Sequence, residues 1–328
     1  MDRILFLDSY YPQVFKAKAT FFGTADYYSE AFNGYGWAAM DLIVNDPSVS
    51  RAMAHEQIAK FKPNVIYCQD LSWLQPDEIE FYKMEGIKVV GQISSQLPSD
   101  DVVKNYQILF TSFPHYLKKF RELGVRGEFL QIGFGGQRVI DAAIQGGQPE
   151  RDIDIGFVGG LGGGRTQGFW ESGTKLFCDI AEHYPEKFKW WGYASDDTLR
   201  AHPTLARCYQ GEAWGLDMYK IYSRCKMVVN RHGEVAQAYS NNMRLFEATG
   251  MGALMLTEES YNIEQYFQPW YECAVYKDFD SLNMKLAYYL KNEKIVEEMA
   301  KAGRARTMRD HIYDKVLIKV HRVLKGIE

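Results

Sequence analysis

The chain has 328 residues, which is longer than one hydrophobic core usually supports, so two domains are expected. Its hydrophobic share of 46% and charged share of 24% are those of an ordinary folded protein and exclude disordered and collagen-like classes. A formal net charge of -4 argues against a nucleic-acid binder that neutralises many phosphates, and five widely spaced cysteines indicate neither a disulfide framework nor a zinc site.

The N-terminal apolar run stops at Asp8, which is too soon for a signal peptide or a membrane span. No later segment contains the roughly eighteen consecutive apolar residues that a spanning helix needs. Because the cysteines are odd in number and isolated from one another, a reducing compartment fits best. The sequence therefore predicts a cytoplasmic protein.

Short apolar runs alternate with longer amphipathic stretches along the whole chain, as in parallel strands joined by crossover helices. In the first half, the expected strands are residues 4–7, 65–68, 89–93, 108–111 and 128–131. The expected helices between them are residues 50–61, 77–85 and 114–123. The stretch 145–150, QGGQPE, contains Gly and Pro without an apolar anchor and predicts a linker. We therefore expect domains at residues 1–148 and 149–328 and an α/β fold class.

The second half repeats the alternation and predicts a second doubly wound unit. Its expected strands are residues 153–158, 188–191, 227–229 and 253–256. Its expected helices are residues 168–183, 215–225 and 243–249, followed by a long helical tail from residue 281.

A glycine-rich loop, GGLGGGRT at residues 159–166, directly follows the first strand of this second half. Gly159, Gly160 and Gly164 would let the backbone approach a ligand closely and turn N–H groups toward an anion, and Arg165 would add a positive charge. The loop is also one residue away from a Walker A motif, with Arg165 in place of the lysine, so an NTPase is the rival interpretation. No apolar strand ending in Asp follows at a suitable distance, and the dinucleotide fingerprint G-x-G-x-x-G is not matched.

The segment NNMRLFEATGMGALML predicts a helix with an open N-terminus. Asn242 or its neighbour 241 is a natural N-cap, and Gly250 suits the end of the helix. The free N–H groups and Arg244 could face a diphosphate, while Glu247 could accept hydrogen bonds from ribose hydroxyls. The alternative is that Arg244 and Glu247, three residues apart, form only a surface ion pair.

Further candidates stand at expected strand ends, where α/β folds place ligands. Arg231 and His232 end one strand, Gly192 follows another, and Gly211 precedes the next helix. The DxD sequence at residues 152–154 precedes its strand, so we interpret it as solvation of the strand edge and expect no metal site. On the first half, the candidates at strand ends are Asp8, Tyr10, Asp70 and Gln96.

Several segments between about residues 152 and 323 resemble a known family when taken together. They are DIDIGFVGG with its following arginine, the Gly211 loop and its helix, NNMRLFEATGMGALMLTEE, and the tail that contains AKAGRARTMRDHIY. The combination is similar to the GT-B glycosyltransferases, in particular the CgeB-like branch related to glycosyltransferase group 1 and family 4. The resemblance implies two Rossmann-like domains that face a central cleft.

The resemblance also implies roles for individual residues. Glu247 takes the place of the second glutamate of the E-x7-E motif, which holds the donor ribose, whereas Tyr239 stands where the first glutamate would be. Arg165 is similar in position to the basic residue that contacts the donor diphosphate. On this basis Arg165 and Glu247 are the catalytic candidates, and the full donor-binding set is Gly159, Gly160, Gly164, Arg165, Gly192, Gly211, Arg231, His232, Asn242, Arg244 and Glu247.

The implied function is transfer of a sugar from a UDP or GDP sugar, with retention of configuration and without a metal or other cofactor. The expected partners are the nucleotide sugar and a glycan or lipid-linked acceptor, with peripheral membrane contact left open and no nucleic acid. A P-loop-like NTPase and a non-catalytic sugar-nucleotide-binding module remain the alternatives.

Overall fold

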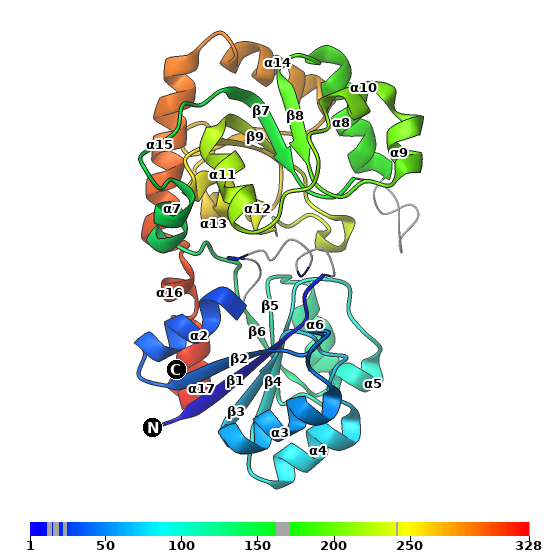
Figure 1. The fold of residues 1–328 in the computed structure, drawn as a ribbon, viewed down its shortest axis with the longest axis vertical. Coiled ribbons are helices and arrows are strands. Elements are labelled where there is room, and N and C mark those ends of the chain that lie inside the picture. Colours follow the sequence, from blue (N-terminus) through cyan, green and yellow to red (C-terminus); the bar gives the residue numbers. More distant parts are fainter. Residues whose placement is uncertain (12–14, 16–19, 22–24, 162–170, 241, 328) are drawn as a thin grey trace. The chain divides into compact units, whose positions relative to one another are not determined.

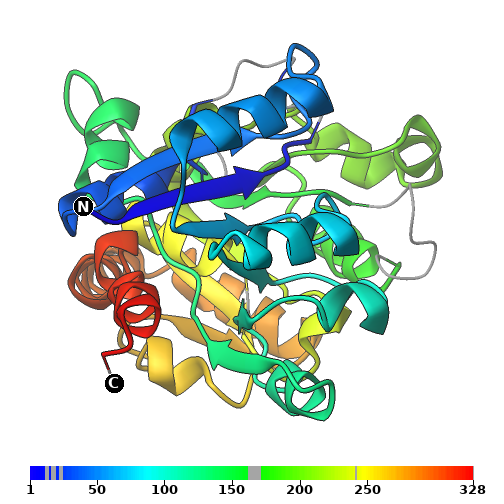
Figure 2. The ribbon, with the colours of Figure 1, turned by 90° about the horizontal axis from the view of Figure 1, so that it is seen from below.

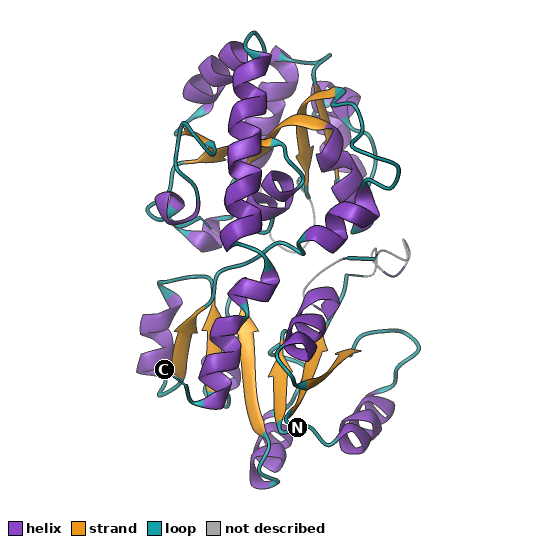
Figure 3. Cartoon of the chain, turned by 90° about the vertical axis from the view of Figure 1, so that its left-hand side faces the viewer, coloured by secondary structure: helices purple, strands orange, loops and turns teal. Residues whose placement is uncertain are grey.

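The computed structural model describes the chain except residues 12–14, 16–19, 22–24, 162–170, 241 and 328. Two compact units make up the chain (Figure 1): the first comprises Met1–Ile132 and Tyr313–Glu328, and the second comprises Gly133–Ile312. Each unit holds one parallel sheet with helices packed on its faces (Figure 3). The predicted α/β class with two doubly wound units is confirmed.

The sheet of the first unit has six parallel strands in the order β2-β1-β3-β4-β5-β6, which can be followed in Figure 2. The chain forms β1 first, places β2 on one side and then β3 on the other, so a topological switch point lies between β1 and β3. The strands are β1 (Arg3–Asp8), β2 (Ala38–Ile43), β3 (Val65–Cys68), β4 (Lys88–Ile93), β5 (Ile108–Thr111) and β6 (Arg126–Phe129).

Helices cover both faces of this sheet because successive side chains of a strand point to opposite faces. Leu5 and Leu7 face a core that includes Ile58 and Ile79, whereas Phe6 faces the other way and packs edge-on against Tyr28. The helices are α2 (Ala25–Gly34), α3 (Arg51–Phe61), α4 (Pro76–Met84), α5 (Asp100–Val103), α6 (Tyr116–Glu122), α16 (Tyr313–Val316) and α17 (Ile318–Lys325).

The C-terminal tail belongs to the first unit although it follows the whole second unit in sequence. The ring of Tyr313 stacks on that of Tyr27, with 4.9 Å between centroids. Trp37 Nε1 donates a hydrogen bond of 2.9 Å to His321 Nδ1. These contacts join α16 and α17 to the N-terminal sheet and its helix α2.

The sheet of the second unit has five parallel strands in the order β11-β10-β9-β7-β8, so its switch point lies between β7 and β9. The strands are β7 (Ile153–Val158), β8 (Phe188–Trp191), β9 (Cys225–Asn230), β10 (Leu254–Glu258) and β11 (Ala274–Tyr276). The helices are α7 (Gln137–Ala143), α8 (Glu171–His183), α9 (Asp196–Ala201), α10 (Pro203–Cys208), α11 (Leu216–Arg224), α12 (Arg244–Gly250), α13 (Ile263–Tyr266), α14 (Phe279–Tyr289) and α15 (Glu293–Asp310).

The structure divides the chain differently from the domains 1–148 and 149–328 that the sequence suggests. The chain enters the second unit at Gly133, and Phe134 already donates its backbone N–H to His311 O at 2.8 Å. The Gly- and Pro-containing stretch 145–150 is a loop inside this unit, where Gln148 Nε2 donates to Ser223 O. The polar stretch is therefore a loop within the second unit. The chain enters this unit near Phe134, whose aromatic ring is buried.

Most strands lie where the sequence predicts them, but β2 and β11 were not predicted. The strand β2 is only partly buried at the edge of its sheet, and β11 has three residues, so neither produces a clear apolar run. The predicted strand at 128–131 is instead β6, Arg126–Phe129. Among the described residues, no helix combines the length and the apolar character needed to cross a bilayer.

Candidate functional site

Several of the predicted donor-binding residues lie at the carboxyl edge of the sheet in the second unit. Gly159 follows β7, Gly192 follows β8, and Arg231 follows β9. Because the strands are parallel, all three positions lie at the same edge, and the first and third flank the switch point. This is where open α/β sheets bind their ligands.

The glycines at this edge are required by backbone contact. Gly159 donates its N–H to Trp191 O at 2.8 Å, and Gly192 donates to Gly211 O at 2.9 Å. Gly192 has a φ of 136°, and a Cβ there would lie 2.2 Å from Gly159 O. By contrast, a Cβ on Gly160 would find its nearest neighbour at 3.6 Å. The three loops therefore touch through their main chains, which only glycine permits at residue 192.

Arg244 lies beside these glycines and is held in one orientation. Its Nε donates to Val158 O at 2.9 Å, its Nη1 donates to Asn230 Oδ1 at 2.8 Å, and its guanidinium lies 4.5 Å from the centre of the Phe157 ring. A Cβ on Gly159 would come within 2.4 Å of Nη2. The glycine thus leaves room for a fixed positive charge at the ends of β7 and β9.

Asn230 connects Arg244 to the neighbouring polar residues, and its role was not predicted from the sequence. Its fully buried amide oxygen accepts hydrogen bonds from both Arg244 and Asn242, while its amide nitrogen donates to Thr257 Oγ1 at 2.9 Å. Asn242 also bonds Arg231 O. The available signal was a polar residue closing the otherwise apolar run CKMVVN.

The first turn of α12 differs slightly from the expectation. The helix begins at Arg244 with Met243 at the N-cap position, so Asn242 stands one residue earlier than an N-cap would. Its Oδ1 nevertheless accepts the Leu245 N–H at 3.3 Å. The predicted capping interaction is present, with the boundary shifted by one residue.

Arg231 and His232 are oriented by Glu258 at the end of β10. Glu258 Oε1 lies 3.3 Å from Arg231 Nε, and Oε2 accepts the His232 backbone N–H at 2.8 Å. Burial, with the nearby positive charges, lowers the pKa of His232 to about 3, so the imidazole is neutral. Its Nε2 lies 3.1 Å from Thr257 Oγ1 and 3.3 Å from Ser240 Oγ. A neutral imidazole in contact with two hydroxyl groups can orient polar neighbours without adding charge to the site.

These residues line a pocket of about 320 Å³, which we call the β9–β10 pocket. Tyr239 lines it together with Gln237, whose φ of 53° is unusual for a residue with a side chain. Its remaining lining residues are Arg231, His232, Gly233, Glu234, Ala238, Glu258, Glu259, Ser260 and Lys277.

Glu247 is buried inside the unit, with 6% of its surface exposed. Its Oε1 accepts a hydrogen bond of 3.3 Å from the Tyr219 hydroxyl. Burial raises the pKa of Glu247 to about 7, against the opposing effects of the Arg244 charge and this hydrogen bond. Arg244 and Glu247 thus have different partners and do not form the surface ion pair that was the alternative interpretation.

Gly164 and Arg165 lie outside the described residues, so their predicted roles stay predictions. Among the residues that the structure does describe, no three His, Cys, Asp or Glu side chains gather in a way that could hold a metal ion. The two acids of the DxD sequence form ion pairs at the opposite edge of the sheet, Asp152 with Arg224 and Asp154 with Lys226. Both carboxylates are thus paired with basic side chains, at the edge of the sheet opposite the candidate donor site.

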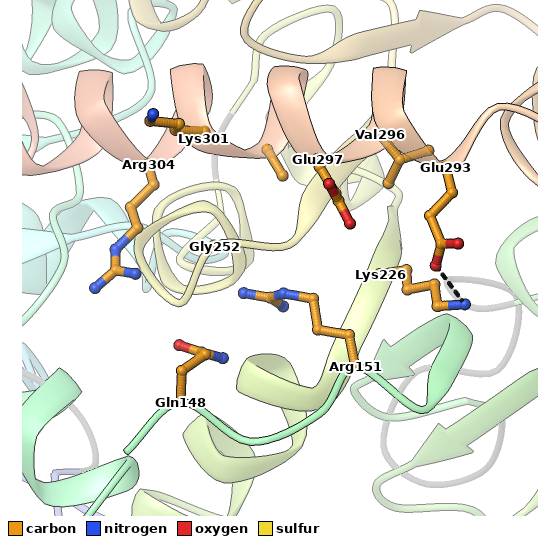
Figure 4. A pocket seen from close by; sticks show the side chains of 10 residues that line it. Gln148, Arg151, Lys226, Gly252, Glu293, Val296, Glu297, Lys301 and Arg304 are labelled. Carbon is orange, nitrogen blue, oxygen red and sulfur yellow. Dashed lines mark ion pairs between the residues drawn. The ribbon is translucent and has the colours of Figure 1, made fainter.

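That opposite, amino-terminal edge holds another pocket, of about 230 Å³, shown in Figure 4. Its central guanidinium, that of Arg151, donates to Cys225 O at 2.5 Å and to Met251 O at 3.0 Å. Lys226 pairs with Glu293 at 2.9 Å on its rim (Figure 4). Since Arg151 is engaged with carbonyls where α11 and α12 end, this pocket is explained as a structural capping site.

The carboxyl edge of the sheet in the first unit carries acidic and hydroxyl groups. Asp8 ends β1 and accepts the Ser9 N–H at 2.8 Å, and Ser9 Oγ donates to Asp70 Oδ2 at 2.7 Å. These residues meet at the β1–β3 switch point. Tyr10 and Gln96, the other candidates of this half, lie in loops after β1 and β4.

Comparisons with known proteins agree on the fold. The chain is similar to sucrose-phosphate synthase from Thermosynechococcus elongatus, with a TM-score of 0.65, 12% identity and coverage of 100% of this chain and 99% of that one. It is similar to Anabaena HepE in complex with UDP-glucose, with a TM-score of 0.64, 11% identity and coverage of 99% and 100%. A third similar structure is a putative UDP-N-acetylglucosamine 2-epimerase from Listeria monocytogenes, with a TM-score of 0.57, 10% identity and coverage of 99% and 96%. No curated protein sequence matches this chain.

These likenesses and the two doubly wound units define a protein of the GT-B glycosyltransferase fold. Within it, residues 168–322 match the family described as glycosyl transferase-like. The chain thus has the GT-B fold that the sequence resemblance implied, and just under half of its length matches the glycosyl transferase-like family.

Proposed function

We propose that this protein transfers a hexosyl group from a nucleoside diphosphate sugar, of UDP or GDP type, to a hydroxyl of a glycan or lipid-linked acceptor. Of the three similar structures named above, one is a complex with UDP-glucose and another is a putative UDP-N-acetylglucosamine 2-epimerase, which supports the choice of donor class. The proposed reaction retains configuration, needs no metal and takes place in the cytoplasm as a step of polysaccharide assembly.

The observation that carries the proposal is the group of Gly159, Gly192 and Arg244 at the switch point of the second unit. A guanidinium anchored by Asn230 presents positive charge at the edge where open α/β sheets bind their ligands, and the neighbouring Gly159 and Gly192 carry no side chain. A diphosphate fits this chemistry, and Arg165 would add a second positive charge from the same loop.

In the proposed reaction, the bond between the anomeric carbon and the diphosphate oxygen breaks while the acceptor oxygen bonds to the same carbon, and the proton of the acceptor hydroxyl passes to the leaving diphosphate. Negative charge grows on the leaving diphosphate, and preorganised donors that face it lower the barrier. Glu247 would hold the ribose hydroxyls as a hydrogen-bond acceptor. Asp8 and Asp70 of the first unit are the proposed acceptor-side groups, since paired carboxylates accept hydrogen bonds from sugar hydroxyls.

A thermal-shift screen of nucleotides and nucleotide sugars tests the donor class. A ligand at 100 times its dissociation constant adds roughly 2.7 kcal/mol of stability, which such a screen detects. We expect stabilisation by UDP or GDP sugars and none by NAD or by ATP with magnesium. Selective stabilisation by ATP and magnesium would favour the NTPase alternative instead.

A transfer assay that follows release of the nucleoside diphosphate tests the chemistry. Arg165→Ala should lower the transfer rate about a hundredfold, the scale seen when one preorganised donor is removed. EDTA should leave wild-type transfer intact. Donor binding without any release of diphosphate, across all acceptors tried, would identify a binding module. Abolition by EDTA with a silent Arg165→Ala variant would overturn the metal-free assignment.

A further inference from the structure

A second groove, of about 460 Å³, adjoins the β9–β10 pocket on the side of β11, and we call it the aromatic groove. Glu259, Ser260 and Lys277 line both hollows, so the two are neighbours along the ends of β10 and β11. Its other lining residues are Tyr261, Ile263, Glu264, Pro269, Trp270, Val275, Tyr276, Ser281 and Lys285.

Two large aromatic side chains of this groove are exposed to solvent. Tyr261 is 82% exposed and Trp270 is 64% exposed. Trp270 has a φ of 69°, a left-handed conformation that is a genuine outlier for a bulky residue. The ammonium of Lys285 lies 4.6 Å from the centre of its ring. Neither burial nor local backbone preference explains this placement, and strain of this kind gathers at functional sites.

The turn that carries Trp270 is braced from within the unit. Trp270 donates its N–H to Cys273 O at 2.7 Å, and the buried Glu272 carboxylate accepts the Gln268 N–H at 2.7 Å. Helix α15 abuts the same turn at Gly303, where a Cβ would lie 2.5 Å from Glu272 O. The glycine of the AKAGRAR tail motif therefore fixes the turn, and the indole is presented by a preorganised loop.

The charges of the groove select the class of ligand. Two carboxylates, Glu259 and Glu264, are balanced by two ammonium groups, Lys277 and Lys285. A balanced set does not attract a polyanion, but it offers both acceptors and donors to hydroxyl groups. Exposed aromatic faces pack against the C–H faces of sugar rings and have a polar rim within reach. The combination suits a neutral, hydroxyl-rich chain.

We propose that the aromatic groove is a binding subsite for a neutral oligosaccharide, with Trp270 and Tyr261 as stacking platforms. Because it adjoins the β9–β10 pocket, it would hold the extended part of a glycan. The binding requires no nucleotide, so it stands or falls separately from the proposed transfer reaction.

Isothermal titration calorimetry of the full chain with maltohexaose, cellohexaose, laminarihexaose and chitohexaose, without nucleotide, tests the proposal. We expect the wild type to bind at least one of them, and Trp270→Ala and Tyr261→Ala each to weaken that binding about tenfold or more. Tyr271→Ala is the matched control, because Tyr271 belongs to the same turn, is 60% exposed and does not line the groove. It should leave the affinity unchanged.

Trp270→Gly separates ligand binding from folding. Glycine accepts the left-handed conformation, so this variant should unfold at the same or a higher temperature than the wild type while losing hexasaccharide binding. Thermal shifts with UDP and GDP should be the same in the wild type and in every variant. The proposal is overturned if the wild type binds none of the four hexasaccharides, if Tyr271→Ala weakens binding as much as Trp270→Ala, or if dextran sulfate binds in their place.

Discussion

The two units share a parallel, doubly wound architecture, yet their switch points have opposite chemistry. In the first unit, Asp8 and Asp70 meet across Ser9. In the second, Gly159 and Arg244 meet beside the buried amide of Asn230. The topology fixes where a ligand can bind, but the residues that end the strands decide its charge. An acidic edge repels an anion, whereas the fixed positive charge of Arg244 at the second edge attracts one.

The largest expected effect comes from removal of the C-terminal tail, Tyr313–Glu328, which belongs to the first unit. A chain that ends at Ile312 lacks five large buried side chains, and burial of that much apolar surface contributes on the order of 10 kcal/mol. The five are Tyr313, Val316, Leu317, Val320 and Leu324. That is comparable to the whole stability of a domain, so we expect the first unit to unfold.

Hydrogen exchange measured by mass spectrometry checks this expectation. Peptides from β1 and β3 should lose protection, whereas those from β9 and β10 should keep it. A chain that ends at Gly326 serves as the control and should resemble the wild type. Equal loss of protection in both sheets would show that the units are not separate.

The next effect concerns the glycines that close the second edge. Gly192→Ala would place a Cβ against Gly159 O and force alanine into a φ of 136°, which together should lower the free energy of unfolding by about 4 kcal/mol. Gly160→Ala should change it by less than about 1 kcal/mol, since its new Cβ meets only ordinary contacts. Urea denaturation of both variants measures these changes. If Gly192→Ala destabilises the protein as little as Gly160→Ala, the loops that carry Gly159 and Gly192 do not touch.

Arg244→Ala tests the anchored charge itself. It removes the side-chain donor to Val158 O and one of the two donors to the buried Asn230 amide oxygen, so the free energy of unfolding should fall by about 3 kcal/mol. Binding of the nucleoside diphosphate should weaken as well. Arg244→Lys is the control, because it keeps the charge but not the forked geometry. Its stability and its affinity for the nucleoside diphosphate should lie between those of the wild type and Arg244→Ala. Unchanged stability in Arg244→Ala would contradict the contacts assigned to this side chain.

The smallest expected effect is the pH dependence contributed by Glu247. Its pKa in the folded state, about 7, is above the ordinary 4.5, so the folded protein binds the proton more tightly than the unfolded chain. Its contribution to stability is therefore most favourable at low pH and declines as the pH rises from about 4.5 through 7. Glu247→Gln, which cannot ionise, should be more stable than the wild type at pH 8 by up to about 3 kcal/mol and similar at pH 4.

Urea unfolding of both proteins across that range measures the difference. If the carboxylate also accepts ribose hydroxyls, donor affinity of the wild type should rise between pH 6 and 8, and that of Glu247→Gln should not. If the two proteins differ in free energy of unfolding by the same amount at every pH, the pH dependence does not come from Glu247.

The alternation of apolar runs and amphipathic segments determined by itself the class, the two doubly wound units and most strand positions. That information is local, because burial of a strand or helix leaves its period in the residues next to one another. The candidates that end strands, such as Gly159, Gly192 and Arg231, were found in the same way, since a parallel sheet places the ends of its strands at one edge.

Only the tertiary structure decided what these candidates touch. Arg244 bonds the carbonyl of a residue 86 positions away, and the helix that contains His321 returns to a unit that the chain left at Ile132. Neither leaves a periodic trace in the sequence, so the unit boundary and the role of Asn230 were missed. Pairings of this kind depend on which surfaces meet when the whole chain packs, because a buried polar group must find its partner wherever the fold supplies one.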